Sequence, residues 1–172
     1  MARYGKHGEQ TYRQNFNRKK KDCIDWLLLN LSLARRVLDM DGLLAIAIDP
    51  CYISKAWKKT PHIGRFWSGC AGAVKHGLEI MGIGLLDVVN NKCMMLRAHQ
   101  TIGNSALKMR NKTLVEYYIS VMKRYSKKLL SITDIVVADA FFSTSTFEKN
   151  ASATTISVIL RSFFEYRFIT LM

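Results

Sequence analysis

The sequence predicts an α/β protein with a mixed sheet and flanking helices, and three patterns lead to this class. Two short apolar runs at 43–48 and 135–138 are bounded by polar or turn residues, which is typical of buried strands. Apolar residues recur at helical spacing over 22–39 and 113–130, which predicts two amphipathic helices. Between them, two strand-like segments meet at Asn90-Asn91, a pair that favours a turn and therefore predicts a hairpin.

The N-terminal region is basic and is expected to be helical. Residues 1–21 contain seven Lys or Arg and one acid. Within them, 9–16 predicts a short helix carrying Arg13, a side chain suited to phosphates or bases. A solvated basic arm explains the same composition equally well. Asp22 is the expected N-cap of the 22–39 helix, whose apolar stripe indicates packing rather than chemistry.

The stretch from 51 to 76 has little regular pattern and predicts a long loop. It brings basic and aromatic side chains together: Lys55, Trp57, Lys58, Lys59, Arg65, Phe66 and Trp67. Cations that bind phosphates and rings that stack on bases are the chemistry of a nucleic-acid contact. The candidate nucleic-acid contacts in this stretch are therefore Lys55, Lys58, Lys59, Arg65 and Trp67. The alternative for the aromatic rings is that they fold back on the core.

The hairpin is expected to pair residues 77–89 with residues 93–100. Gly82 and Gly84 weaken the first of these strands or mark a bulge in it. Residues 101–111 follow as a polar, basic loop before the second long helix.

Composition limits the classes of function. With 172 residues, the chain forms one domain of ordinary size, or one domain and a small appendage. No apolar run approaches the roughly 18–20 residues that cross a bilayer, so we expect a cytoplasmic protein without a membrane partner. The net charge of +13 predicts a polyanionic partner, most often nucleic acid. The four cysteines are too scattered for a zinc site and are expected to be reduced thiols.

Two carboxylates follow the two buried strands. Asp49 comes directly after 43–48, and Asp139 directly after 135–138. The 113–130 helix can act as a crossover that lays the later strand parallel to an earlier one. If the two strands are neighbours, their backbones lie about 4.8 Å apart and both carboxylates project from one end of the sheet. Adjacent carboxylates repel unless a proton or cation intervenes, and Mg²⁺ prefers such oxygen ligands, which predicts a metal-dependent nuclease-like site. The alternative is that each Asp merely begins a turn.

Five segments in order along the chain carry a family resemblance. They are 3–16 (RYGKHGEQTYRQNF), 45–55 (AIAIDPCYISK), 64–72 (GRFWSGCAG), 75–79 (KHGLE) and 136–143 (VVADAFFS). Together they resemble the DDE transposases of bacterial insertion sequences, whose catalytic domain has the ribonuclease-H-like fold. The first segment resembles the end of the family's N-terminal DNA-binding region, and the resemblance covers about residues 3–147.

The resemblance implies roles for particular residues. Asp49 and Asp139 correspond to two of three catalytic carboxylates, which bind Mg²⁺ or Mn²⁺. Such enzymes hydrolyse a phosphodiester at the transposon end, and the freed 3′-hydroxyl then attacks target DNA. The implied partners are transposon-end and target DNA, with a homodimer on the DNA, and Lys55 and the 65–67 stretch are expected to orient it.

The third carboxylate, a Glu on a later helix, has no convincing match. Glu148 follows Asp139 too closely, and Glu165 lies in a stretch without family resemblance. We therefore expect a truncated DDE transposase with little or no strand transfer. The alternatives are a non-catalytic DNA-binding remnant and a basic protein that binds RNA or ribosomes.

Three regions are expected on this interpretation. Residues 1–41 form a basic helical remnant of the DNA-binding part. Residues 42–150 form a ribonuclease-H-like core that is incomplete at its C-terminus. Residues 151–172 form a divergent tail.

Overall fold

The structure is a computed structural model, and its main body lies between residues 24 and 142. It describes residues 8–11, 14, 24–56, 60–139 and 142, and the backbone of 157–161 and 166–169. The helices of the main body are α2 (Trp26–Ala34), α3 (Asn104–Met109) and α4 (Leu114–Leu130), with a 3-10 turn η2 at Gly69–Ala71. The strands are β1 (Leu44–Ser54), β2 (Gly64–Ser68), β3 (Ala73–Asp87), β4 (Lys92–Gln100), β5 (Ile135–Ala138), β6 (Ser157–Arg161) and β7 (Tyr166–Ile169).

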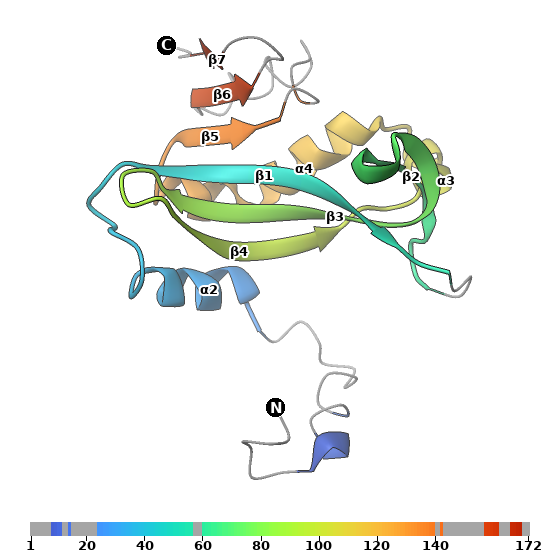
Figure 1. The fold of residues 1–172 in the computed structure, drawn as a ribbon, viewed down its shortest axis with the longest axis horizontal. Helices are drawn as coiled ribbons and strands as arrows, with labels where there is room; N and C mark the ends of the chain where they lie inside the picture. Colours follow the sequence, from blue (N-terminus) through green and yellow to red (C-terminus); the bar gives the residue numbers. More distant parts are fainter. Residues whose placement is uncertain are drawn as a thin grey trace.

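The seven described strands form one mixed sheet in the order β2-β3-β1-β5-β6-β7, with β4 also paired to β3 (Figure 1). β1 is antiparallel to β3, from Leu44↔Asp87 to Ser54↔Gly77. β2 and β4 share the other edge of β3, β2 near its start and β4 near its end. β5 is parallel to β1, and β6 is parallel to β5. The predicted α/β class with a mixed sheet and flanking helices is confirmed, and the condition set for the two carboxylates, that the first buried strand and 135–138 are neighbours, is met.

Both long helices begin at residues whose side chains satisfy free backbone N–H groups. Thr113 and Glu116 form a capping box at the start of α4: the Thr113 hydroxyl accepts from the Glu116 N–H, and the Glu116 carboxylate accepts from the Thr113 N–H. At the start of α2, the Asp25 carboxylate accepts from the Leu28 N–H at 3.2 Å. The N-cap is therefore Asp25, and the prediction of Asp22 was wrong.

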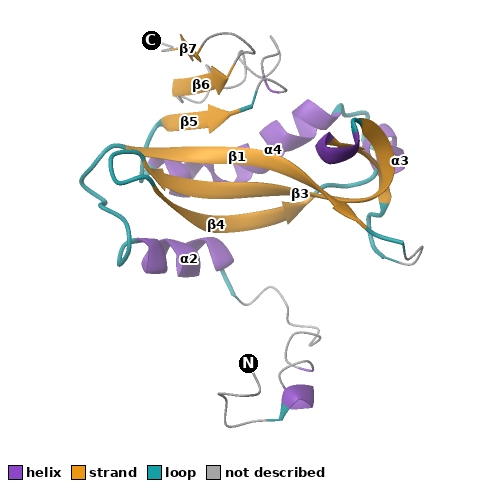
Figure 2. Ribbon diagram, in the orientation of Figure 1, coloured by secondary structure: helices purple, strands orange, loops and turns teal. Residues whose placement is uncertain are grey.

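The core lies on one face of the sheet, under α2 and α4 (Figure 2). Alternate residues of the central strands supply the sheet's part of this core: Leu44, Ile46, Ile48, Met81, Ile83, Leu85, Val136 and Ala138. α2 contributes Leu27, Leu31 and Ala34, and α4 contributes Tyr118, Val121, Met122 and Leu129 among others. The N-terminal helix and the sheet therefore share one core. None of the described helices is long and apolar enough to cross a membrane.

The loop predicted for 51–76 was wrong in part, because β1 runs on to Ser54 and β2 and η2 follow within the same stretch. The continuation of β1 is held by its long-range pairing with β3. Pro50 lacks an N–H group, but β5 pairs only as far as Ile48, so Pro50 lies where one edge of β1 is open among the described strands. The polar loop predicted for 101–111 contains α3. Of the two alternatives for Gly82 and Gly84, a bulge in the first strand was wrong: the register shifts between Ile83 and Gly84, but the extra residue is Leu96 of β4.

Candidate metal centre and nucleic-acid interface

The parallel pairing of β1 and β5 brings Asp49 and Asp139 together. The register pairs Ile46 with Val136 and Ile48 with Ala138, so Asp49 and Asp139 directly follow the last paired residues, Asp49 within β1 and Asp139 just after β5. Neighbouring parallel strands lie about 4.8 Å apart, and residues in register project to the same face. Both side chains are exposed. Two carboxylates from segments 90 positions apart in the chain therefore meet at the same level of one sheet face.

Asp49 lies inside β1, and the expectation that the strand ends there was wrong. What ends at Ile48 is the pairing with β5. On its other side Asp49 pairs with Gly82 of β3, and a Cβ added to Gly82 would lie 3.2 Å from the Met95 Cε. Asp49 thus lies where β3 continues to pair with β1 and β5 has ended, with Gly82 as its neighbour on β3.

The electrostatics of the pair match two neighbouring acids. The pKa of Asp49 is raised, first by partial burial of its carboxyl and second by the negative charge of Asp139. A cation between the two groups relieves this repulsion. Carboxylate oxygens are hard ligands, so the donor set fits Mg²⁺ or Mn²⁺. Among the described residues no group of three His, Cys, Asp or Glu is placed to hold a metal, and Glu148 and Glu165 lie outside those residues.

The face that carries the two aspartates is opposite the core, and we call it the open face. Its members on β1, β2 and β3 alternate with core residues and are Ala47, Asp49, Cys51, Ile53, Arg65, Trp67, Val74, His76, Leu78, Ile80 and Gly82. β5 adds Val137 and Asp139, and β4 adds Met95. No described helix contributes core residues from this side. Large apolar side chains consequently remain exposed here, including Trp67 and Met95.

Arg65 and Trp67, both candidate DNA contacts, lie on this face. They pair with His76 and Val74 of β3, which share the face of Gly82 and hence of Asp49. Trp67 is 61% exposed, whereas the intervening Phe66 is 4% exposed and points into the protein. The alternative that the aromatic residues fold back on the core is therefore right for Phe66 and wrong for Trp67.

The register also gives the spacing between these side chains and the aspartates. On β3, Gly82 pairs with Asp49, His76 pairs with Arg65 and Val74 pairs with Trp67. Gly82 is therefore six residues from His76 and eight residues from Val74 along the strand. At about 3.4 Å per residue, these separations are roughly 20 Å and 27 Å. A single strand of stacked nucleotides rises about 3.4 Å per step, so Trp67 is about eight nucleotides from the aspartates.

Of the other candidate contacts, Lys55 is exposed directly after the end of β1. Arg13, Lys58 and Lys59 lie outside the described residues. The structure thus associates three of the six candidates, Lys55, Arg65 and Trp67, with the β1–β3–β2 part of the sheet.

Sequence reasoning missed a side-chain contact that joins the end of β1 to the start of β3, where β3 also pairs with β2. The Tyr52 hydroxyl donates to the His76 carbonyl oxygen at 2.7 Å, across the strand from Arg65. A Cβ at Gly77 would collide with the Tyr52 ring and the Ile53 carbonyl oxygen, so only glycine fits. A glycine inside a strand signals close backbone approach, and that was the available clue.

No protein-family model matches this chain, and no curated protein sequence matches it.

Proposed function

We propose that this chain is a DNA-transposition protein of the DDE type, in which Asp49 and Asp139 bind Mg²⁺ or Mn²⁺ and the open face binds DNA. The observation that supports this best is the parallel pairing of β1 and β5, which makes the two aspartates neighbours on a face free of described helices. The sequence segments around both aspartates are those that resemble the family.

The order of elements supports a ribonuclease-H-like core. Three strands, β1, β3 and β4, run antiparallel in succession, with β2 as an addition to the edge of β3. The helix α4 follows, and β5 then returns parallel to β1. This is the mixed sheet with a crossover helix that the resemblance implies.

In this proposal the side chains of the open face have separate tasks. Asp49 and Asp139 supply the oxygen ligands, and a divalent cation held there stabilises negative charge on the attacking and leaving oxygens of a phosphodiester. Arg65 binds backbone phosphates at a position some 20 Å from the aspartates along the sheet. Trp67 offers an exposed ring on which a base stacks. The chain therefore orients a strand over the aspartates through contacts remote from them.

Binding to a labelled DNA duplex with an unpaired single-stranded end, measured in Mg²⁺ and in EDTA, tests both parts of the proposal. We expect Mg²⁺ to strengthen binding, and Asp49→Asn to abolish that difference while leaving binding in EDTA unchanged. Asp134→Asn is the matched control, because it removes an exposed carboxylate from the other end of β5. Loss of one stacked base through Trp67→Ala is expected to cost about 1–3 kcal/mol, and Trp26→Ala, another exposed tryptophan, is its control.

The outcomes separate the candidate functions. Equal binding in Mg²⁺ and EDTA by wild type and Asp49→Asn would refute the metal site and favour the non-catalytic DNA-binding alternative. Unchanged binding by Trp67→Ala would refute the open face as the DNA surface.

A further inference from the structure

A second cationic region lies on the helix-covered side of the sheet, where β4 meets α4. Arg97 and His99 of β4 pair with Ile83 and Met81, which are core residues, so both side chains project toward α4. The Arg97 guanidinium carbon lies 4.9 Å from the centre of the Tyr125 ring. This cation–π contact holds the guanidinium against the helix.

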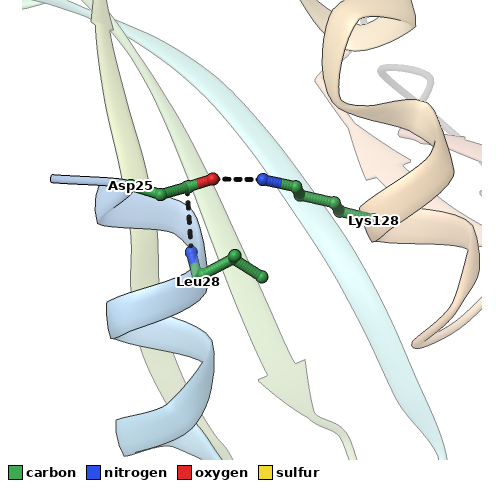
Figure 3. A network of polar contacts seen from close by, with 3 residues as sticks. All are labelled: Asp25, Leu28 and Lys128. Carbon is green, nitrogen blue, oxygen red and sulfur yellow. Dashed lines mark hydrogen bonds and ion pairs between the residues drawn. The ribbon is translucent and has the colours of Figure 1, made fainter. Parts of the chain in front are cut away.

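The charge of Arg97 is poorly compensated. Its side chain is half-buried, and its buried Nε–H has no hydrogen-bond partner. The charge of Arg97 acts weakly on the Asp25 carboxylate. The pKa of Asp25 is lowered mainly by its hydrogen bond from Lys128 and only to a small extent by Arg97. Asp25 is already engaged by Lys128 across the gap from α2 to α4 (Figure 3). One carboxylate therefore serves two cations.

The charges of further guanidinium groups affect the neighbouring His99 and Tyr117. The His99 Nε2 lies 3.0 Å from the Tyr117 hydroxyl, which donates to the Gln100 carbonyl oxygen. Burial lowers the pKa of His99, and the charges of Arg124 and Arg97 lower it further. Burial raises the pKa of Tyr117, and the charges of Arg110 and Arg124 oppose that rise. Arg124 therefore affects both titratable groups, while Arg97 affects His99 and Arg110 affects Tyr117.

The cluster has a simple structural origin. On α4, Tyr117, Val121, Arg124 and Lys128 follow at spacings of four, three and four residues, which forms one stripe along the helix. Arg110 comes directly after α3, just before α4 begins. Arg110 and Arg124 are exposed, and neither they nor Arg97 makes an ion pair with a described carboxylate.

We propose that Arg97, Arg110 and Arg124 form a second nucleic-acid surface that contacts the phosphate backbone of duplex DNA. Guanidinium groups bind phosphate oxygens through paired N–H donors, and the exposed side chains of Arg110 and Arg124 present such donors to solvent. β4 pairs only with β3 among the described strands, and α2 packs beside it, where the Asn30 side-chain amide donates to the Leu96 carbonyl oxygen at 2.8 Å. The exposed cations of this surface are therefore Arg110 and Arg124, with Arg97 half-buried behind them. The surface faces away from Asp49 and does not depend on metal binding there.

Its position relative to the open face follows from the register. Ala98, next to Arg97, pairs with Gly82, and Gly82 pairs with Asp49. Two strand spacings separate the backbones by about 10 Å, and the side chains of Arg97 and Asp49 project to opposite faces. One duplex segment on each face would therefore be held by separate sets of side chains.

The salt dependence of binding to a mixed-sequence duplex tests the proposal. Arg124→Gln is the deciding variant, because its exposed side chain has little part in packing. The matched control is Lys123→Gln, which removes one charge from the same helix. Lys123 is about 200° around the helix axis from Tyr125, the ring that Arg97 contacts, so its side chain projects away from Arg97. We expect Arg124→Gln to reduce the slope of log Kobs against log salt by about 0.9 and Lys123→Gln to leave it unchanged.

Two further arms complete the experiment. Arg97→Gln is expected to give a similar loss of slope, with its thermal midpoint measured because the residue is half-buried; if it fails to fold, the Arg124 result decides. The Arg124 effect is expected to persist in an Arg65→Gln, Trp67→Ala background, which separates this surface from the open face. An unchanged slope in Arg124→Gln would overturn the proposal. So would displacement of the duplex by millimolar inorganic phosphate at constant ionic strength, which would indicate a small-anion site.

Discussion

The two faces of the sheet are made by alternate residues of the same strands, yet they differ in every property that matters for function. Met81 on the covered face is 0% exposed, whereas Met95 on the open face is 55% exposed. The covered face joins α2 and α4 in one core. The open face carries Asp49, Asp139 and Trp67. The covered face therefore provides stability, while the open face keeps two acids and an aromatic ring available for a ligand.

The largest expected difference between the faces concerns the two methionines. Met81→Ala removes a fully buried side chain and is expected to lower the free energy of unfolding by about 2–5 kcal/mol. Met95→Ala, the same substitution on the open face, is expected to cost within about 0.5 kcal/mol. Urea unfolding at neutral pH measures both. Equal losses would mean that the open face is buried in solution, which would contradict the difference in burial between the two faces.

A buried polar contact under α4 gives the next largest effect. The Tyr118 hydroxyl donates to the Glu79 carboxylate, and both residues are buried. Burial and this hydrogen bond raise the pKa of Tyr118, so it stays a protonated donor. Tyr118→Phe is expected to cost about 1–3 kcal/mol in urea unfolding, because it leaves a buried carboxylate without that donor. In Tyr52→Phe the lost bond is exposed, and we expect about 0.5–1 kcal/mol; a larger loss there than in Tyr118→Phe would contradict the account.

The ion pair between Asp25 and Lys128 is expected to contribute less. Both side chains are 40% exposed, and pairs of this kind couple by about 0.2–1 kcal/mol. A double-mutant cycle with Asp25→Asn and Lys128→Gln measures the coupling, and asparagine keeps the helix cap. The coupling is expected to shrink in 1 M salt. A coupling that salt does not change would show that the Asp25–Lys128 pair is shielded from solvent. It would also mean that α2 and α4 pack more closely in solution than the exposure of the two side chains indicates.

The smallest effect is a pH dependence from Asp49. Its pKa in the folded protein is raised, so ionised Asp49 destabilises the fold above that pKa, and the penalty disappears as pH falls through it. Asp49→Asn is therefore expected to be slightly more stable than wild type at pH 7, and the difference is expected to vanish at acid pH. The lowered pKa values of Asp25, Asp87 and Glu116 act in the opposite sense, but they are common to both proteins. Urea midpoints between pH 3 and 7 measure the difference; a less stable variant at pH 7 would reverse the sign.

Local patterns predicted the elements with strong local signals. The 113–130 helix has a clear apolar stripe and a capping box, and α4 follows it within one residue. The β3–β4 hairpin was predicted from a turn pair, but its irregularity was expected in the first strand, whereas the extra residue lies in β4. The crossover helix allowed the later strand to run parallel to an earlier one, but which strand it joined was left as a condition that only the pairing of β1 with β5 meets.

The sequence did not reveal elements that depend on distant partners. β1 continues through Pro50 to Ser54 because β3 is long enough to pair with it, and nothing in residues 50–54 alone requires a strand. β2 likewise exists through its pairing with the start of β3. The exposure of Trp67 and burial of Phe66 follow from that pairing, so basic and aromatic composition alone could not separate them. The arginine cluster joins residues of β4, α3 and α4 and has no linear motif.

The central claim is that Asp49 and Asp139 together bind a divalent cation. Titration of the protein with Mn²⁺, followed by electron paramagnetic resonance of the free ion, tests it most directly. We expect weak binding by wild type, with a Kd on the order of 10⁻³ M for an exposed site with few charged ligands. Asp49→Asn and Asp139→Asn are each expected to abolish it, and Asp134→Asn to leave it intact. Equal Mn²⁺ binding by wild type and both site variants would contradict the account.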